Sequence, residues 1–335
     1  MSQLEALQQI IGKRILVVGD VMLDVYRVAT ATRISPEAPV PVLLNPTVEY
    51  RLGGAGAVAA MCRALGAQVD LMGCVGFDLA GEHVRGLVGM LGIGDKILST
   101  PAPRPTTSKE RICGVASGRH RQQLGRIDTE CTDPISSGTS MAMAELIRRK
   151  AAETDAPAAI IIADYAKGVC VDRVVQACRD TGIPVYVDPP KGGDWQKYYG
   201  VECLVPNRDE AGCKSAYTIA RNLQSQAVVT KLDEDGCELY YRYQGIKRFP
   251  ARTRAVHDVT GAGDQFIATL ACARVLGLGW ESATQIANAA AGLQVERHGC
   301  VPVTLAELNK ELTHAEHLHA VENDPAGQTL ASAAP

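Results

Sequence analysis

The residues Asp258-Val259-Thr260-Gly261-Ala262-Gly263-Asp264 combine a glycine turn with carboxylates, directly before an apolar segment. Gly261 and Gly263 have no Cβ, so their backbone can adopt positive φ and bring N–H groups close to an anion. A helix over the Ala-, Ile- and Leu-rich residues 265–276 would add the positive end of its dipole at the same place. The pattern predicts a phosphate-binding turn with Asp264 at the mouth of a helix.

Asp264 is the residue of this turn that could do chemistry. A carboxylate beside a phosphate is useful when it handles a proton or a cation, and we interpret Asp264 as the base that takes a proton from an attacking hydroxyl. Aspartate is also among the best N-cap residues, so helix capping is the alternative interpretation. The rest of the chain decides between the two.

Short apolar segments alternate with segments of helical pattern in the middle of the chain. Residues 158–163 and 185–188 are predicted strands, and residues 171–180 between them are a predicted helix. This alternation predicts βαβ units and a parallel sheet, which binds ligands beyond the carboxyl ends of its strands. Polar residues after predicted strands are therefore site candidates, although each alone could be a turn or a cap; they are Asp20, Asp164, Asp188, Asn207 and Lys231.

Two stretches, about 24–50 and 104–128, interrupt the strand–helix alternation. Both have the pattern of strands without a helix between them, and prolines at positions 36, 39 and 41 fit edge strands. We expect them to form a small β-sheet beside the main sheet. Such a sheet has an apolar face to bury, which makes dimerisation through it physically reasonable.

The heptapeptide resembles the C-terminal signature of the ribokinase-like (PfkB) sugar kinases. Three further segments occur in family order: the strand 14–20 leading to Asp24, the glycine-rich Gly53-Gly54-Ala55-Gly56, and residues 206–210, Pro-Asn-Arg-Asp-Glu, where the family has Asn-x-x-Glu. The resemblance implies a doubly wound, mostly parallel α/β sheet flanked by helices over residues 1–312, with the small sheet as a lid over the sugar and a homodimer contact. It also implies that Asp264 is the catalytic base and that Gly261, Ala262 and Gly263 stabilise the transferred phosphoryl group.

The resemblance further implies the ligands. ATP is the phosphoryl donor, and its Mg²⁺ would interact through waters with Glu210 or Asp209, because Mg²⁺ keeps most of its water shell. The family often binds a monovalent cation such as K⁺ near the anion hole through backbone carbonyls. The implied nucleotide-binding residues are Asn207, Lys231, Asp258, Thr260, Gly261, Gly263 and Asn288. The implied sugar-binding residues are Asp20, Asp24, Arg33, Gly53, Gly54, Lys109, Arg111 and Asp164.

Residues 33–42, Arg-Ile-Ser-Pro-Glu-Ala-Pro-Val-Pro-Val, closely resemble the lid segment of the heptose 7-phosphate kinases of ADP-heptose synthesis for lipopolysaccharide. This resemblance implies transfer to the anomeric O1 of D-glycero-D-manno-heptose 7-phosphate, giving the 1,7-bisphosphate. The 7-phosphate would need cations at the far end of the sugar pocket, and Lys109 is our first choice. The alternative for each lid cation is a solvated charge on an edge strand; the candidates are Arg33, Lys109, Arg111, Arg119 and Arg121.

Ala57 departs from the family pattern, since an asparagine that helps to hold the sugar hydroxyls is expected at this position. Loss of a hydrogen bond to a hydroxyl alters substrate preference or weakens binding. A kinase for another sugar, sugar phosphate or nucleoside therefore stays open. A non-catalytic sugar-binding protein is a third possibility, against which the intact Asp264 and glycine turn argue.

Composition bounds the remaining possibilities. The 335 residues, 46% hydrophobic, can bury one large α/β core plus a small accessory element. A formal charge of −3 without a block of lysines or arginines argues against nucleic acid as a partner. Eleven cysteines without a Cys-x-x-Cys pair are interpreted as small core residues in a reducing compartment. With no apolar run long enough for a bilayer, we expect a cytoplasmic protein without membrane contact.

The C-terminal residues 313–335 are expected to form a mobile tail. His314, His317 and His319 have a spacing that could bind a metal, but the tail interpretation is simpler. Some heptose kinases continue into a fused adenylyltransferase domain, so we expect nucleotidyl transfer to come from a separate downstream nucleotidyltransferase.

Overall fold

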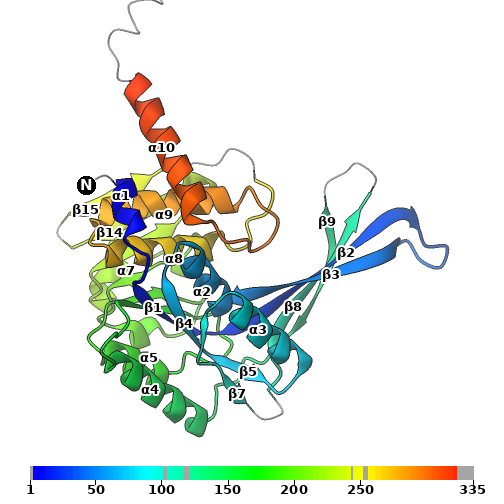
Figure 1. The fold of residues 1–335 in the computed structure, drawn as a ribbon, viewed down its shortest axis with the longest axis horizontal. Helices are drawn as coiled ribbons and strands as arrows, with labels where there is room; N and C mark the ends of the chain where they lie inside the picture. Colours follow the sequence, from blue (N-terminus) through cyan, green and yellow to red (C-terminus); the bar gives the residue numbers. More distant parts are fainter. Residues whose placement is uncertain (1–2, 101–103, 117–120, 243, 252–255, 323–335) are drawn as a thin grey trace, which may run out of the picture.

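The structure is a computed structural model that describes residues 3–100, 104–116, 121–242, 244–251 and 256–322. Its centre is a nine-stranded sheet of order β15-β14-β13-β12-β11-β10-β1-β4-β6 (Figure 1). The pairs from β6 to β13 are parallel, and β14 and β15 add antiparallel strands at one edge. The strands are β1 (Arg14–Gly19), β4 (Gln68–Met72), β6 (Gly94–Asp95), β10 (Ala159–Ala163), β11 (Val185–Asp188), β12 (Cys203–Leu204), β13 (Ala227–Lys231), β14 (Cys237–Tyr241) and β15 (Gly245–Phe249).

Helices cover both faces of this sheet, which explains why its central strands are continuous apolar runs. All five residues of β10, Ala-Ile-Ile-Ile-Ala, are buried, as expected for a parallel strand with helices on both sides. One face packs on α1 (Gln3–Gln8), α2 (Ala55–Ala64), α3 (Leu79–Met90), α8 (Ala262–Val275), α9 (Trp280–Gln294) and α10 (Leu305–Glu322). The other packs on α4 (Ser137–Ala151), α5 (Asp172–Arg179), η1 (Trp195–Tyr198), α6 (Arg208–Ala211) and α7 (Ala216–Leu223).

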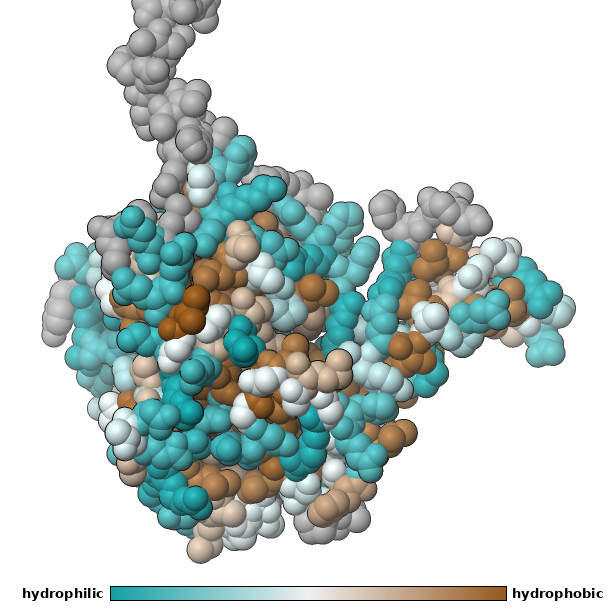
Figure 2. All heavy atoms as spheres, viewed as in Figure 1, coloured by the Kyte–Doolittle hydropathy of each residue, from teal (hydrophilic) through white to brown (hydrophobic). Residues whose placement is uncertain are grey.

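A second sheet of four strands, the lid, projects from the body (Figure 1). Its order is β3-β2-β8-β9, and the central pair β2–β8 is parallel. β2 begins one residue after β1 ends, and β3 leads straight into α2, so the lid is rooted at the carboxyl edge of the main sheet. The lid carries apolar side chains on its projecting part (Figure 2). Its strands are β2 (Val21–Ile34), β3 (Pro41–Gly54), β8 (Thr107–Val115) and β9 (Gln122–Thr129); a short pair, β5 (Cys74–Gly76) and β7 (Leu98–Thr100), lies apart from it.

The predicted fold class is confirmed, with differences at two helices. α8 begins at Ala262 rather than after Asp264, so the candidate base lies in the first helical turn. α10 extends to Glu322, so the predicted tail boundary at residue 312 falls inside a helix. The rest of the predicted tail, 323–335, and the side chains of His317 and His319 lie outside the described residues. No helix in the described ranges is both long and apolar enough to cross a membrane.

Candidate active site

The glycine turn has the geometry of an anion hole. Gly261 is the N-cap of α8 with φ +85°, and a Cβ there would lie 2.8 Å from Cys300 Sγ. A Cβ on Gly263 would lie 2.9 Å from Lys231 Nζ, so the missing side chain is what lets this ammonium approach the turn. Within the described chain, the N–H groups of Gly263 and Asp264 have no backbone acceptor, as the first turn of a helix requires. These donors and Lys231 converge where a phosphoryl group would bind.

Asp264 is half-buried beside this turn. Burial raises its pKa to about 6, and the negative charge of Asp188 acts in the same direction. A hydrogen bond from the Tyr165 hydroxyl to Oδ1 and the charge of Lys231 oppose the rise. A carboxylate with a pKa close to the working pH suits a general base.

Lys231 is the centre of an ionic cluster at the carboxyl ends of β11 and β13. Its Nζ lies 2.8 Å from Asp188 Oδ1. Burial alone lowers the pKa of Lys231, but Asp188 and Glu210 outweigh it, so its pKa is raised and the charge is retained. Burial, followed by Asp188, raises the pKa of Glu210 to about 7. Three carboxylates, including Asp264, thus act on one ammonium, and the cluster has an excess of negative charge.

The predicted Asn-x-x-Glu segment forms the N-terminus of α6. The Asn207 side chain accepts from the Glu210 N–H at 2.8 Å, and Glu210 Oε2 accepts from the Asn207 N–H at 2.6 Å, which is a capping box. This box fixes Glu210 toward Lys231. Asp209 lies instead on the exposed surface, 3.3 Å from Lys191 Nζ, so the structure does not bring this predicted metal-site residue into the cluster.

Three predicted nucleotide-binding residues hold loops around the turn. Asp258 accepts from the N–H groups of Thr260 and Gly299, both at 2.9 Å, and so ties the turn to the loop that carries Cys300. Thr260 follows it in the same turn, with its carbonyl 3.3 Å from Gln294 Nε2. Asn288, buried in α9, donates to the Pro250 carbonyl at 2.7 Å. In this structure the contacts of these three residues shape the site's borders.

The root of the lid supplies a second charged group. Asp24 on β2 and Arg111 on β8 form a buried ion pair of 2.7 Å. A Cβ on Gly53 would lie 3.0 Å from Asp24 Oδ2, so the missing side chain lets β3 pass close to this buried carboxylate. Gly54 adopts φ +55° where β3 meets α2. Arg51 joins the same lid face to the body by donating to the His298 carbonyl at 2.7 Å. This lid face therefore borders the loop beside the anion turn.

Lys109 lies close to Asp24 at the root of the lid, whereas Arg33 lies far from it. Lys109 is paired in register with Asp24 and with Asp128, so all three side chains share a face of the lid. Lys109 makes no ion pair with any described residue. Arg33 is exposed near the outer end of β2, roughly 25–30 Å along the strand from Asp24. This separation places Arg33 outside a sugar pocket built around Asp24 in the same chain.

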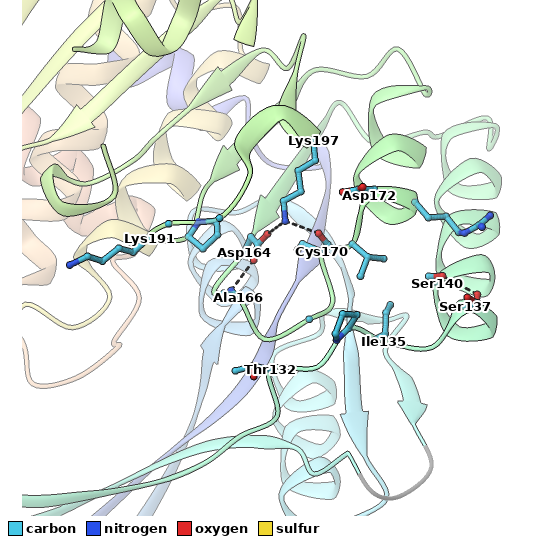
Figure 3. Close-up of a pocket in the computed structure, with 17 residues that line it drawn as sticks. Thr132, Ile135, Ser137, Ser140, Asp164, Ala166, Cys170, Asp172, Lys191 and Lys197 are labelled. Carbon is cyan, nitrogen blue, oxygen red and sulfur yellow. Dashed lines mark hydrogen bonds and ion pairs between the residues drawn. The ribbon is translucent and has the colours of Figure 1, made fainter. Parts of the chain in front are cut away.

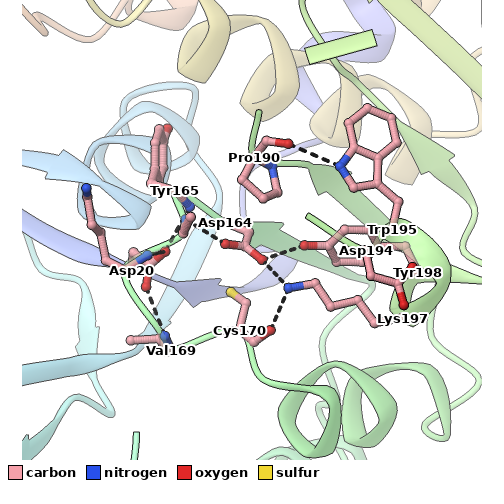
Figure 4. Close-up of polar contacts among 12 residues, drawn as sticks. Asp20, Asp164, Tyr165, Val169, Cys170, Pro190, Asp194, Trp195, Lys197 and Tyr198 are labelled. Atoms are coloured by element: carbon pink, nitrogen blue, oxygen red, sulfur yellow. Dashed lines mark hydrogen bonds and ion pairs between the residues drawn. The ribbon is translucent and has the colours of Figure 1, made fainter. Parts of the chain in front are cut away.

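Asp20 and Asp164 are occupied by structural contacts (Figure 4). Asp20 is 1% exposed and accepts from the backbone N–H groups of Tyr165, Lys167 and Val169. Asp164 pairs with Lys197 at 2.7 Å and accepts from the Tyr198 hydroxyl. Asp164 thus faces the α5 and η1 side of the sheet, where it lines an open cavity of about 580 Å³ (Figure 3), rather than Asp264.

Two site residues were not predicted, namely Tyr165 and Cys300. Tyr165 is the second residue after β10 and contacts the base, and the rule that ligands bind beyond strand ends could have identified it. Cys300 comes from a loop with no pattern of its own. Asp188 was a candidate by the same rule, and the structure places it on Lys231.

The chain belongs to the pfkB family of carbohydrate kinases, whose match spans residues 13–306. Among curated proteins it is 40% identical over 316 residues to the bifunctional protein HldE of Methylobacillus flagellatus, covering 89% of this chain and 63% of that protein. It is 38% identical over 329 residues to the D-beta-D-heptose 7-phosphate kinase of Bordetella bronchiseptica, covering 93% of this chain and all of that protein. The chain thus spans less than two thirds of the bifunctional relative.

Solved structures support the fold. Arabidopsis thaliana ribokinase complexed with ribose and ATP aligns with a TM-score of 0.64 at 21% identity, covering 90% of this chain and 99% of that one. Phosphofructokinase-2 from Escherichia coli in complex with potassium aligns with a TM-score of 0.72 at 16% identity, covering 91% and 99%. At these sequence identities, the likeness shows the fold alone.

Proposed function

We propose that this protein transfers the γ-phosphoryl group of ATP to the anomeric hydroxyl of a heptose 7-phosphate. The observation that carries the proposal is Asp264 in the first turn of α8, beside free backbone donors and the Lys231 ammonium. The full-length similarity to the Bordetella bronchiseptica kinase supports the substrate class. Eleven free thiols and the use of ATP favour a cytoplasmic location.

In the proposed reaction the sugar lies between the root of the lid and the carboxyl edge of the main sheet. Asp264 takes the proton of the acceptor hydroxyl as its oxygen attacks the γ-phosphorus in line, and the bond to the β-phosphate oxygen breaks. The N–H groups of Gly263 and Asp264 and the charge of Lys231 stabilise the developing negative charge. Asp24, at the root of the lid beside Gly53, accepts from sugar hydroxyls.

The residues at the site fit a divalent cation brought in with ATP. Asp188, Glu210 and Asp264 together carry more negative charge than Lys231 compensates. Glu210 is the residue that would hold Mg²⁺, through water, and the ion would supply neutralisation of the phosphate charge. We propose no dedicated K⁺ ligands in this chain, although the potassium complex of the Escherichia coli neighbour makes K⁺ a reasonable addition to assays.

Lys109 is the residue that we propose for the 7-phosphate. The described arginines near Lys109 on this lid face already have carboxylate partners: Arg51 pairs with Glu49, Arg111 with Asp24 and Arg126 with Asp128. Lys109 lies between these pairs with no carboxylate of its own among the described residues. An uncompensated ammonium on a half-buried surface gains most from a phosphate.

The test is ADP release with ATP and Mg²⁺ across heptose 7-phosphate, fructose, ribose, fructose phosphates and adenosine. We expect selective turnover of heptose 7-phosphate. Lys109→Met should raise KM for that substrate about 10-fold or more, because one charged hydrogen bond to the phosphate is lost. Lys247→Met, on an exposed lysine of β15, is the matched control. Turnover by wild type with equal KM in Lys109→Met would contradict the phosphate assignment.

A kinase for another sugar is the second candidate, and Ala57 is the observation that favours it. Ala57 lies in the first turn of α2 and is 2% exposed, so its methyl group offers no hydrogen bond to a sugar. Selective turnover of another compound in the panel would transfer the substrate assignment without changing the mechanism. No turnover of any compound would favour a binding protein.

We also propose that the lid forms the contact of a homodimer. Tyr50 of β3 and Ile127 of β9 lie in one register row across the lid, and Val48 follows in the next outward row. All three are more than a third exposed, and they share the face opposite to Asp24. The Arg27–Glu110 ion pair shares this face, and a second copy can cover the exposed apolar side chains around it.

The acid limb of the pH profile should report Asp264. Its pKa is raised by burial to about 6, and the base acts only when deprotonated. We therefore expect kcat to fall toward a tenfold loss per pH unit below about pH 6, rather than below the ordinary value near 4. Initial rates at saturating substrates from pH 4.5 to 8.5 check this, since saturation limits the effect of phosphate titration. A kcat constant down to pH 5 would contradict it.

A further inference from the structure

Tyr165 contacts the candidate base directly. Its hydroxyl donates to Asp264 Oδ1, and burial together with the charge of Asp264 raises the pKa of Tyr165 well above its ordinary value. The phenol therefore keeps its proton at any working pH and acts only as a donor. One oxygen of Asp264 is thus occupied, and the other is left for the acceptor hydroxyl.

The backbone that carries Tyr165 is held by a buried carboxylate. Asp20 accepts from the N–H groups of Tyr165 at 2.8 Å and of Lys167 and Val169, both at 3.1 Å (Figure 4). Asp20 is itself fixed, because its own N–H donates to the Ala163 carbonyl at 3.1 Å. Ala166 in this loop adopts φ +55°, which is an unfavourable conformation for a residue with a Cβ. The loop is held in one shape by the Asp20 bonds.

We propose that Tyr165 is a positioning residue that orients Asp264 for proton transfer, and that Asp20 acts through the 165–169 loop to place Tyr165. The proposal rests on the kinase function proposed above. The acceptor proton moves to the free oxygen of Asp264, the oxygen–phosphorus bond forms as ADP leaves, and the Tyr165 proton stays in place. The sequence predicted Asp20 as a sugar ligand. In this proposal Asp20 does not contact the sugar but acts through Tyr165 and Asp264.

The hydrogen bond also lowers the pKa of the base, against the larger effect of burial. Five other groups influence Asp264 from neighbouring elements: Asp24, Asp188, Glu210, Lys231 and Cys300. Among the groups that lower the pKa of Asp264, Tyr165 has a larger effect than Lys231. Removing the phenol hydroxyl therefore has a predictable sign: the pKa of Asp264 rises.

The experiment compares wild type, Tyr165→Phe and the control Tyr240→Phe, whose ring packs edge-to-face on Tyr217 far along the chain. For Tyr165→Phe we expect kcat to fall about 10-fold to 100-fold. The acid limb should move upward by about one pH unit, because the ionised form loses a charge-assisted hydrogen bond. Tyr240→Phe should match wild type in both. A lower kcat with an unmoved acid limb, or an unchanged kcat, would overturn the proposal.

Asp20→Asn tests whether the Asp20 hydrogen bonds to the 165–169 loop place Tyr165. This variant also provides a second test of the proposal if Tyr165→Phe fails to fold. Asparagine keeps the shape but replaces an acceptor oxygen by a donor, so part of the loop's hydrogen bonding is lost. We expect the acid limb to move in the same direction, and the double variant to be no slower than the slower of the two single variants. Fully additive losses would contradict a shared path through Tyr165.

A measurement that does not depend on turnover tests the role of Tyr165 separately from the proposed kinase function. The ¹³C carboxyl signal of Asp264, assigned by its loss in Asp264→Asn, should titrate at higher pH in Tyr165→Phe than in wild type. If no sugar is phosphorylated but this shift is present, the kinase assignment fails while the contact stands. If turnover is normal and the titration is unmoved, the positioning role fails alone.

Discussion

Asp264→Asn is expected to lower kcat about 10³-fold while ATP binding is almost unchanged. The substitution removes the proton acceptor and keeps the size of the side chain, so the loss falls on the chemical step. Coupled ADP release gives kcat, and calorimetric titration with ATP gives the affinity. Asp155→Asn, an exposed carboxylate paired with Arg14, is the matched control. Turnover within tenfold of wild type would contradict the proposed base.

The same variant should be as stable as wild type, or more stable, at pH 7. The pKa of Asp264 is raised in the folded protein to about 6, so the folded state binds this proton more readily than the unfolded chain does. The associated stability is present below about pH 4 and is lost as pH rises through about 6. A neutral asparagine avoids this loss, worth about 1–2 kcal/mol after allowance for solvent. Thermal unfolding at pH 4 and pH 7 measures the difference.

Gly261→Ala is expected to lower kcat about 10²-fold or more, comparable with the loss of one oxyanion-hole donor. The residue has φ +85°, and a new Cβ would lie 2.8 Å from Cys300 Sγ and 3.3 Å from Met61 Cε. Both backbone strain and contact would displace the N–H groups of the turn. Gly86→Ala in α3, where a Cβ meets nothing within 4 Å, should retain full activity.

A second substitution separates the two causes in Gly261→Ala. Cys300→Ala removes the sulfur that the new Cβ would meet, so the double variant should recover part of the activity if the contact dominates. If backbone strain dominates, the double variant should be as slow as Gly261→Ala alone. Wild-type activity in Gly261→Ala itself would show that the turn does not need positive φ at this position.

The sequence predicts strands better than it predicts where side chains point. Residues 185–188 form β11 as predicted, and 158–163 nearly match β10, because buried parallel strands are continuous apolar runs. Asp164 and Tyr165 are adjacent after β10, yet Asp164 faces Lys197 and Tyr165 faces Asp264. Successive side chains at a strand end point to opposite faces, so a one-residue difference exchanges a contact with Lys197 for a contact with the candidate base.

Contacts made by loops without a strand or helix pattern could not be predicted. Cys300 meets Gly261 because Asp258 binds the Gly299 N–H, and Arg51 reaches the His298 carbonyl from the lid. These loops have no periodicity that fixes their path, so only the assembled fold brings them together. The end of α10 shows a second limit, since polar composition predicted a tail from residue 313 where helix continues to Glu322.

The parallel pairing of β2 with β8 has a consequence for how the protein folds. The Asp24–Arg111 pair at the lid root joins residues 87 positions apart in the chain, and the segments between them build α2, β4 and α3 of the body. The β2–β3 pair can form early, but β2 keeps an open edge until β8 arrives after a long loop is closed. Pairings of such sequence separation form slowly. During refolding, sugar-dependent activity should therefore appear only after this long-range pairing has joined β8 to β2.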